Sequence, residues 1–179
     1  MEPRTKLDEA ERKAAARDFD PEPWRRELVV FARRMGAASE AEDVVHEAFV
    51  RALRSPPTTH PRAYLYRVVL HELRDRSRSS RVRSDHAAKV AFERAGRTPE
   101  ADPLRLAEAG ELARLAWRAA EKLPDQQRAA LFLRVQRHMD YDEIASALDC
   151  SIATARSHFH HAVKAVRNAL ERIDGADGA

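Results

Sequence analysis

Cysteine, glycine and aromatic residues are scarce in this chain of 179 residues. A single cysteine, Cys150, excludes an internal disulfide and a cysteine-rich zinc site. Five glycines and 6% aromatic residues argue against a β-sandwich or a barrel. No apolar run approaches the length of a membrane span, so we expect no membrane insertion. The dominant residues are Ala, Arg, Leu and Glu, and this composition favours helices.

Charge is abundant, but its two signs nearly cancel. Charged residues make up 34% of the chain and hydrophobic residues 44%, so a core under a highly charged surface is expected. The formal net charge is only +3, although the sequence pI is about 9.3. The excess of basic residues comes mostly from arginine. The planar guanidinium of arginine can donate two hydrogen bonds to a phosphate or to the edge of a guanine. A solvated surface rich in salt bridges has the same total charge, so the placement of the arginines is more informative.

The N-terminal part of the chain predicts a charged extension followed by a compact unit. Residues 1–21 carry only a thin apolar line, which indicates a frayed or exposed helix, and they lack the apolar core of a signal peptide. We therefore expect a cytoplasmic protein. Residues 22–83 contain three amphipathic patterns. The stripe of the first helix, which Gly36 ends, consists of Trp24, Leu28, Phe31 and Met35.

The second helix of this unit is expected to start at Ser39, with Glu42 in the capping-box position. Its predicted buried face comprises Val44, Val45, Ala48, Phe49, Ala52 and Leu53. Its other face carries Asp43, His46, Glu47, Val50, Arg51 and Arg54. The two faces together predict a helix that packs on one side and presents mixed charge on the other.

The third helix, which Pro61 can open, has a basic side. Cationic residues recur along it at intervals of four and three, so they share one face if the helix persists that far. These residues are Arg67, His71, Arg74, Arg78 and Arg81. A solvated helix end would also be basic, but the regular spacing beside aromatic residues favours nucleic-acid binding.

Residues 84–110 lose this order, and the prolines and glycine in "GRTPEADP" indicate a linker. Residues 111–173 resume helical periodicity, with Leu131, Phe132 and Val135 expected to face inward. Residues 174–179 are expected to be a disordered tail. Strand alternation is not persuasive anywhere. The predicted fold is therefore all-α, with two small helical domains joined by a flexible linker.

The stretch "YDEIASALDCSIATARSHFHHAVKAV" predicts a helix-turn-helix. Asp140 and Glu143 form a capping box, and Ser151 can cap the second helix after a turn at Asp149 and Cys150. The polar side of that second helix carries Thr154, Arg156, Ser157, His158 and His161. A recognition helix presents such residues to base edges in the major groove. The alternative is a corner of a helical bundle with a polar outer face.

Four ordered motifs resemble bacterial RNA polymerase sigma factors, in particular the short extracytoplasmic-function (ECF) group. They are "EAEDVVHEAFVRAL", "PRAYLYRVVLHELRDRSR", "LPDQQRAALFLRVQ" and "YDEIASALDCSIATARSHFHHAVKAVR". The resemblance spans residues 22–83 and 111–172 in the same order as in that group. A lone helix-turn-helix is a weak signal, whereas the ordered set is specific.

The resemblance implies roles for individual residues. Docking on core polymerase would involve Asp43, His46, Glu47, Val50 and Arg51. Recognition and melting of the minus-ten element would involve Arg62, Tyr64, Arg67, His71, Arg74, Arg78 and Arg81. Reading of the minus-thirty-five element would involve Ser151, Thr154, Arg156, Ser157, His158 and His161, with Lys164 on phosphate. The implied partners are the clamp and flap regions of core RNA polymerase, promoter DNA and an anti-sigma factor, with no cofactor and no catalytic residue.

Several residues depart from the family pattern. Tyr64 stands where tryptophan is usual, His71 where asparagine is usual, and Asp149 where the turn usually has glycine. His158 and His161 occupy positions where arginine is frequent. Histidine titrates near pH 6.5 and phosphate favours its charged form, so we expect promoter binding to strengthen as pH falls from about 8 to 6.

Other functions have less support in the sequence. A metal site is disfavoured because His160 and His161 are adjacent and diverge on a helix, and nucleophilic catalysis by Cys150 has less support still. A response regulator would need an α/β receiver domain, which residues 1–110 do not suggest. A sigma-like decoy that sequesters an anti-sigma factor remains an alternative, as does a helix-turn-helix regulator. Run-off transcription with core polymerase separates a decoy from an initiation factor.

Overall fold

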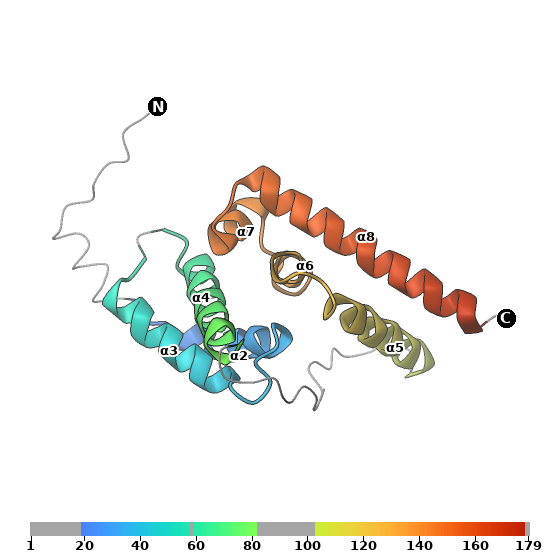
Figure 1. The fold of residues 1–179 in the computed structure, drawn as a ribbon, viewed down its shortest axis with the longest axis horizontal. Helices are drawn as coiled ribbons and strands as arrows, with labels where there is room; N and C mark the ends of the chain where they lie inside the picture. Colours follow the sequence, from blue (N-terminus) through green and yellow to red (C-terminus); the bar gives the residue numbers. More distant parts are fainter. Residues whose placement is uncertain (1–18, 58, 82–102, 178–179) are drawn as a thin grey trace.

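The computed structural model describes residues 19–57, 59–81 and 103–177, with side chains described over 19–57, 59–77 and 110–173. Every element in these ranges is helical, which confirms the all-α prediction. The elements are η1 (Glu22–Trp24), α2 (Arg25–Arg34), α3 (Ala41–Arg54), α4 (Pro61–Arg81), α5 (Pro103–Ala120), α6 (Asp125–Arg137), α7 (Tyr141–Leu148) and α8 (Ile152–Asp177). Figure 1 shows α2, α3 and α4 grouped at one end, with α8 running along α5, α6 and α7 at the other.

The N-terminal unit is built from η1, α2, α3 and α4 around a continuous apolar core. Leu28 and Phe31 of the predicted stripe are fully buried, Met35 is nearly so, and Trp24 is half-buried. Gly36 has φ +107, a left-handed conformation that a Cβ would strain, and it ends the α2 turn as expected. Pro61 opens α4, and that helix persists to Arg81.

Two details of the predicted helices are wrong. Ser39 does not cap α3, because the turn after α2 continues through Glu40 and the first helical bond joins the Val44 amide to the Glu40 carbonyl. Leu53 and Val135 were expected to face inward, yet they are 52% and 47% exposed. Both are the last apolar residues of their patterns, and neither belongs to the buried cluster.

The C-terminal unit starts earlier and ends later than its sequence pattern indicated. Pro103 opens α5, so the last part of the expected linker is helical, while residues 84–102 lie outside the described residues together with the extension at 1–18. The backbone of α8 continues to Asp177, into the tail expected to be disordered. Extending a formed helix adds one hydrogen bond per residue fixed, whereas nucleation is the costly step. A helix packed along most of its length therefore continues past its last core residue.

The two units share one core. The Phe31 ring of α2 lies 5.2 Å from the Phe132 ring of α6, and each is at most 1% exposed. Trp117 of α5 also packs against Phe132, with ring centroids 5.9 Å apart. Helix α4 also contacts α7. The sequence predicted two tethered domains but not this contact between them.

Candidate nucleic-acid interface

The helix-turn-helix begins with the capping box that the sequence predicted. The Glu143 amide donates to Asp140 Oδ1 at 2.8 Å, and the Asp140 amide donates to Glu143 Oε2 at 3.0 Å. Both bonds satisfy amides that a helix start leaves without a partner. Ile144 and Ala145 of α7 face the core, and the small Ala145 side chain is only 5% exposed. The cap and the buried face thus fix where α7 starts and how it is rotated.

The turn between α7 and α8 sets the orientation of α8 relative to α7. Asp149 has φ 54 and ψ 51, the left-handed conformation that its position in the turn requires. Most residues other than glycine pay about 1–2 kcal/mol there, although aspartate is among the more tolerant. Ser151 then caps α8 as predicted, because its Oγ accepts the Thr154 amide at 3.1 Å. The Ser151 and Thr154 hydroxyls also lie 2.8 Å apart.

The outer face of α8 carries the predicted base-reading residues. Ala155 and Ala162 are fully buried against the unit, and the opposite side is open to solvent. The exposed polar residues on that side are Ser151, Thr154, Arg156, Ser157, His161 and Lys164. The Arg156 guanidinium lies 5.1 Å from the centre of the Tyr141 ring. An exposed helix start with free amides and nearby cations suits DNA.

His158 differs from the other residues of this face because it is half-buried. Burial lowers the pKa of His158 below the ordinary value of 6.5, and the neighbouring His161 lowers it further. The imidazole of His158 is therefore largely neutral at pH 7. It can donate or accept a hydrogen bond to a base, but it adds little positive charge until the solution becomes acidic.

We expect acidification from pH 8 to 6 to strengthen DNA binding, by less than about fivefold, because an exposed charge contact is worth less than about 1 kcal/mol. The lowered pKa of His158 places its share of the effect below pH 6.5. The measurement is promoter binding by holoenzyme over this range, for wild type and for His158→Gln/His161→Gln. An identical pH dependence in the two proteins would contradict the assignment.

The basic side of α4 is only partly open. His71 is exposed, Arg67 and Arg74 are half-buried, and the side chains of Arg78 and Arg81 lie outside the described residues. The Tyr64 hydroxyl donates to the Ser55 carbonyl at 2.6 Å, and the Arg67 guanidinium lies 5.2 Å from the Tyr64 ring centre. Tyr64 thus holds the loop before α4 through a hydrogen bond and packs against the guanidinium of Arg67.

Two predicted DNA-binding arginines of α4 have partners inside the protein. Arg62 Nε and Nη2 donate to the two oxygens of Glu27 at 3.0 and 3.1 Å, a bidentate charge-assisted pair. Arg67 Nη1 lies 3.8 Å from Asp149 Oδ1, which belongs to the helix-turn-helix. The residues expected at the minus-ten element therefore contact the unit expected at the minus-thirty-five element.

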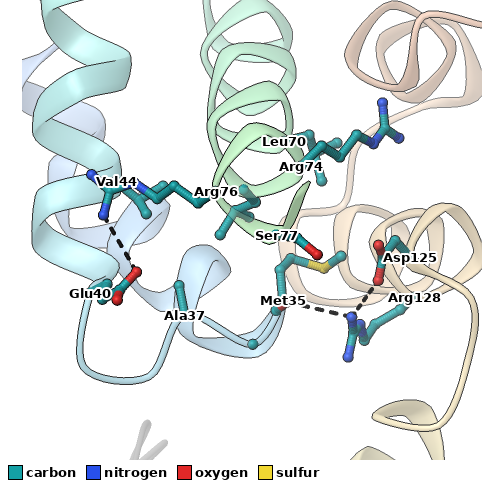
Figure 2. Close-up of a pocket in the computed structure, with 12 residues that line it drawn as sticks. Met35, Ala37, Glu40, Val44, Leu70, Arg74, Arg76, Ser77, Asp125 and Arg128 are labelled. Atoms are coloured by element: carbon teal, nitrogen blue, oxygen red, sulfur yellow. Dashed lines mark hydrogen bonds and ion pairs between the residues drawn. The ribbon is translucent and has the colours of Figure 1, made fainter. Parts of the chain in front are cut away.

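A cavity of about 540 Å³ lies where the turn after α2 meets α4 and α6 (Figure 2). Arg128 of α6 donates to Asp125 at 2.6 Å and to the Met35 carbonyl at 3.4 Å, which joins the two units across one edge of the cavity. Arg76 pairs with Glu40 at 3.4 Å on the opposite side. Carboxylates neutralise these two guanidiniums, and Arg74 lines the cavity as well, so the cavity forms part of the seam between the units.

The expected polymerase-binding face lies on α3. Asp43, His46 and Glu47 are exposed, and Val50 is half-buried beside them. Arg51 is exposed too, but its guanidinium lies 2.9 Å from Glu72 and 3.7 Å from Asp75 of α4. The structure brings these residues onto one side of the N-terminal unit, with Arg51 also tying α3 to α4.

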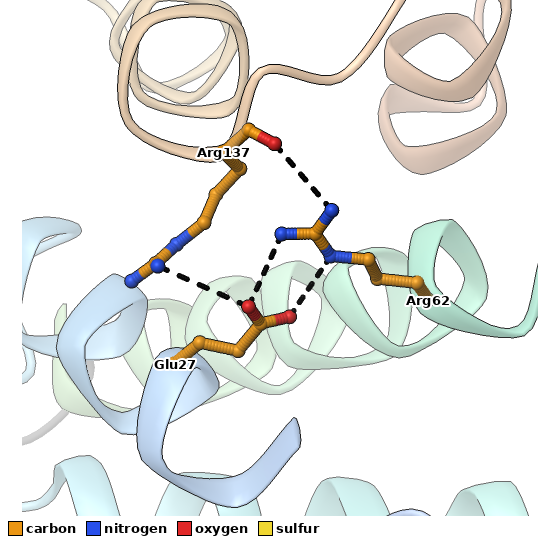
Figure 3. A network of polar contacts seen from close by, with 3 residues as sticks. All are labelled: Glu27, Arg62 and Arg137. Carbon is orange, nitrogen blue, oxygen red and sulfur yellow. Dashed lines mark hydrogen bonds and ion pairs between the residues drawn. The ribbon is translucent and has the colours of Figure 1, made fainter. Parts of the chain in front are cut away.

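Sequence reasoning missed Glu27 and Arg137. Arg137 Nη1 lies 3.9 Å from Glu27 Oε2, and Arg62 Nη1 donates to the Arg137 carbonyl at 3.4 Å. Figure 3 shows the three side chains meeting between α2, α4 and the end of α6. No local pattern could have revealed this, because the three residues are far apart in the sequence and meet only when the units pack.

Within the described ranges, no three His, Cys, Asp or Glu side chains gather closely enough to hold a metal ion. None of the helices in that part of the chain combines the length and apolar character needed to cross a bilayer. Cys150 is half-buried in the turn, and burial raises the pKa of its thiol, with the Asp149 carboxylate adding to the effect. A thiol with a raised pKa is a poor nucleophile at neutral pH.

Each of the two units matches a known protein family. Residues 22–83 match the family described as Sigma-70 region 2, and residues 113–166 match Sigma-70, region 4. The first match covers η1 to α4, and the second runs from the C-terminal part of α5, through α6 and α7, into α8. The two matches occur in the order in which the sequence motifs were recognised.

Curated proteins and a solved structure are similar over most of the chain. The ECF RNA polymerase sigma-E factor of Escherichia coli is 28% identical over 162 residues, which cover 84% of each chain. The RNA polymerase sigma-H factor of Pseudomonas aeruginosa is 27% identical over 157 residues, covering 82% of this chain and 81% of that protein. The sigma factor RpoE of Bartonella quintana, solved in complex with the anti-sigma factor NepR, has a similar fold. Its TM-score is 0.64 at 18% identity, over 84% of this chain and 94% of that one.

Proposed function

The chain belongs to the sigma-70 family, as an RNA polymerase sigma factor of the extracytoplasmic-function group, and from this premise we propose how its helices divide the work of initiation. A sigma factor binds core RNA polymerase, directs it to promoters and assists strand separation. The chemistry of RNA synthesis belongs to the polymerase, so this chain acts as an initiation subunit rather than as a catalyst. It works where polymerase meets the chromosome, in the cytoplasm.

We assign minus-thirty-five recognition to the start of α8. One observation carries this assignment. Thr154, Arg156 and Ser157 are exposed on the first turns of α8, directly after the Ser151 cap. Arginine can donate two hydrogen bonds to a guanine, and short hydroxyl side chains can bond to any base edge. Lys164 lies farther along the helix and is suited to phosphate, which positions the helix without reading sequence.

We assign minus-ten capture and melting to α4 and the loop before it. Opening a duplex requires cations for phosphates and flat side chains on which unstacked bases can rest. Arg67 and Arg74 supply the cations, His71 supplies a polar side chain beside them, and Tyr64 supplies a ring at the start of the helix. The salt dependence of binding should be steep, because each phosphate contact releases counterions.

The exposed acidic residues of α3 are assigned to core polymerase. Substituting Glu47→Lys is expected to weaken core binding by at least about tenfold, because a reversed charge meets like charge across the interface. Equilibrium binding to fluorescently labelled core polymerase measures the effect. The matched control is Glu111→Lys on α5, an exposed glutamate in the other unit. Equal losses from both substitutions would count against the α3 assignment.

Run-off transcription tests the proposed function as a whole. The purified chain with core polymerase should give a promoter-dependent transcript from templates selected out of a genomic library. A decoy that only sequesters an anti-sigma factor would give none. The similar fold of the Bartonella quintana protein, solved with an anti-sigma factor, supports the proposal that such a factor restrains this chain too.

A further inference from the structure

Ile152 is an apolar side chain at the helix start assigned to base reading. It is the first residue of α8, and it is 46% exposed. Its neighbours on this helix start are exposed as well, and they are Ser151, Ala153, Thr154 and Arg156. The polar members of this group are assigned to DNA, whereas Ile152 has no assigned task.

Neither the core nor the helix cap accounts for an isoleucine at this position. The core contact of this turn of α8 is Ala155, which is fully buried, and Ile152 does not belong to the buried cluster. The cap is Ser151, whose Oγ accepts the Thr154 amide at 3.1 Å. Isoleucine is β-branched and forms helices less readily than alanine does, so helix propensity does not favour it here either. Single exposed apolar residues are common on protein surfaces, so the neighbours of Ile152 decide what it contacts.

The first turn of α8 offers methyl groups more than it offers hydrogen bonds. The Thr154 hydroxyl lies 2.8 Å from the Ser151 Oγ, which also accepts the Thr154 amide. Because that hydroxyl already has a partner in the protein, the part of the exposed Thr154 side chain left for DNA is mainly its methyl group. Ile152 and the exposed Ala153 add further methyl groups directly beside it. The turn therefore suits an apolar feature of DNA.

Arg156 indicates which bases lie near Ile152. Side chains four residues apart share one side of a helix, with Cβ atoms about 5–6 Å apart, so Ile152 and Arg156 lie on the same side of α8. The Arg156 guanidinium lies 5.1 Å from the centre of the Tyr141 ring, which restricts its movement. Base pairs follow one another about every 3.4 Å along a duplex. A base that contacts Ile152 therefore lies within about two base pairs of the guanine assigned to Arg156.

Thymine is the base that presents an apolar group in the major groove. Its C5-methyl group projects there, whereas guanine, adenine and cytosine present hydrogen-bond donors and acceptors. Contact between that methyl group and an apolar side chain removes both surfaces from water, which is favourable. A polar base edge against Ile152 would instead lose its water without gaining a hydrogen bond. Ile152 thus distinguishes thymine from the other bases.

We propose that Ile152 is a specificity-determining residue that contacts the C5-methyl group of a thymine within about two base pairs of the guanine read by Arg156. The inference rests on the proposed recognition of the minus-thirty-five element by α8. It adds a preference that the hydroxyl side chains do not supply, because a hydroxyl can bond to several base edges. Promoters selected by the holoenzyme should share this thymine, on either strand of their minus-thirty-five element.

Deoxyuridine tests the methyl group by itself, because uracil pairs as thymine does and lacks only the C5-methyl group. The probe is a promoter duplex selected by reconstituted holoenzyme, in which each thymine of the minus-thirty-five element is replaced in turn. Replacement of one thymine should weaken equilibrium binding of the wild-type holoenzyme by about threefold to fivefold, the effect of one buried methyl group. With Ile152→Ala, the same replacement should no longer change the affinity. This variant should bind the thymine promoter about as weakly as wild type binds the deoxyuridine promoter.

Ile173→Ala is the matched control for Ile152→Ala. Ile173 belongs to the same helix and is 36% exposed, but it lies far from the helix start. The same atoms are removed, and the full response to deoxyuridine should remain. Alanine forms helices readily and Ile152 is exposed, so Ile152→Ala should fold as wild type does.

Three results would overturn the proposal. They are a minus-thirty-five element in which no thymine replacement weakens wild-type binding, an equal loss in Ile152→Ala and wild type, and disappearance of the response in Ile173→Ala as well. Failure of the wild-type chain to give a promoter-dependent transcript would instead contradict the proposed function. The two failures are therefore distinguishable.

Discussion

Substituting Arg156→Ala is expected to reduce promoter-directed transcription by about 5- to 150-fold, because a bidentate contact with guanine discriminates by about 1–3 kcal/mol. Arg156 is exposed on the first turns of α8, and its guanidinium rests over the Tyr141 ring 5.1 Å away. Stacking on that ring restricts the side chain before DNA arrives and lessens the entropy lost on binding. Run-off transcription by reconstituted holoenzyme on a selected promoter gives the measurement.

Arg172→Ala is the matched control for this prediction. Arg172 lies on the same helix and loses the same charge, but it is far from the helix start and its Nε donates to the Asn168 carbonyl. Its replacement should leave transcription nearly unchanged. Lys164→Ala should behave differently again, by lowering the slope of log affinity against log salt by about 0.9, as one phosphate contact is lost. Equal effects of Arg156→Ala and Arg172→Ala would show that only net charge matters.

Substituting Phe132→Ala is expected to lower the free energy of unfolding by about 3–5 kcal/mol, because it leaves a cavity in the core. Phe132 is 1% exposed and touches Phe31 from the N-terminal unit and Trp117 from its own. Urea unfolding followed by circular dichroism measures the loss. Tryptophan fluorescence, to which Trp117 beside the site contributes together with Trp24, provides a second probe.

Val135→Ala, on the same helix, is the control for Phe132→Ala. Val135 is 47% exposed, and surface substitutions of this kind usually change stability by less than about 0.5 kcal/mol. Losses of similar size from the two substitutions would mean that Phe132 is not part of a shared core. A loss confined to the C-terminal unit would place the contact between the units elsewhere.

Local signals predicted much of this structure. The capping box at Asp140, the serine cap at Ser151 and the proline start of α4 are confirmed, because each depends on residues only a few positions apart. The buried stripes of α2 and α3 follow from helical periodicity alone, except that Trp24 is half-buried and Leu53 is exposed. These features also position the outer face of α8, so the residues assigned to base reading were predictable before the structure.

Contacts between distant segments were not predictable in this way. Arg62 was assigned to DNA from its place on a basic helix, yet its guanidinium binds Glu27 in the folded chain. Arg67 likewise lies close to Asp149. The sequence pattern indicated that Asp149 lies in a turn, but it did not indicate that Arg67 would contact it. A periodic pattern shows which side of a helix is polar. It does not show whether solvent, DNA or another part of the same protein meets that side.

The pairing of Phe31 with Phe132 also constrains how this protein can change over generations. The two rings come from units to which we assign separate tasks on DNA, yet they pack against each other with centroids 5.2 Å apart. A replacement in one half is tolerated only if the other half still fits around it. The two halves therefore cannot diverge independently. In a chimaera that joins one half to the matching half of a distant relative, the side chains at the contact between the halves would not pack well.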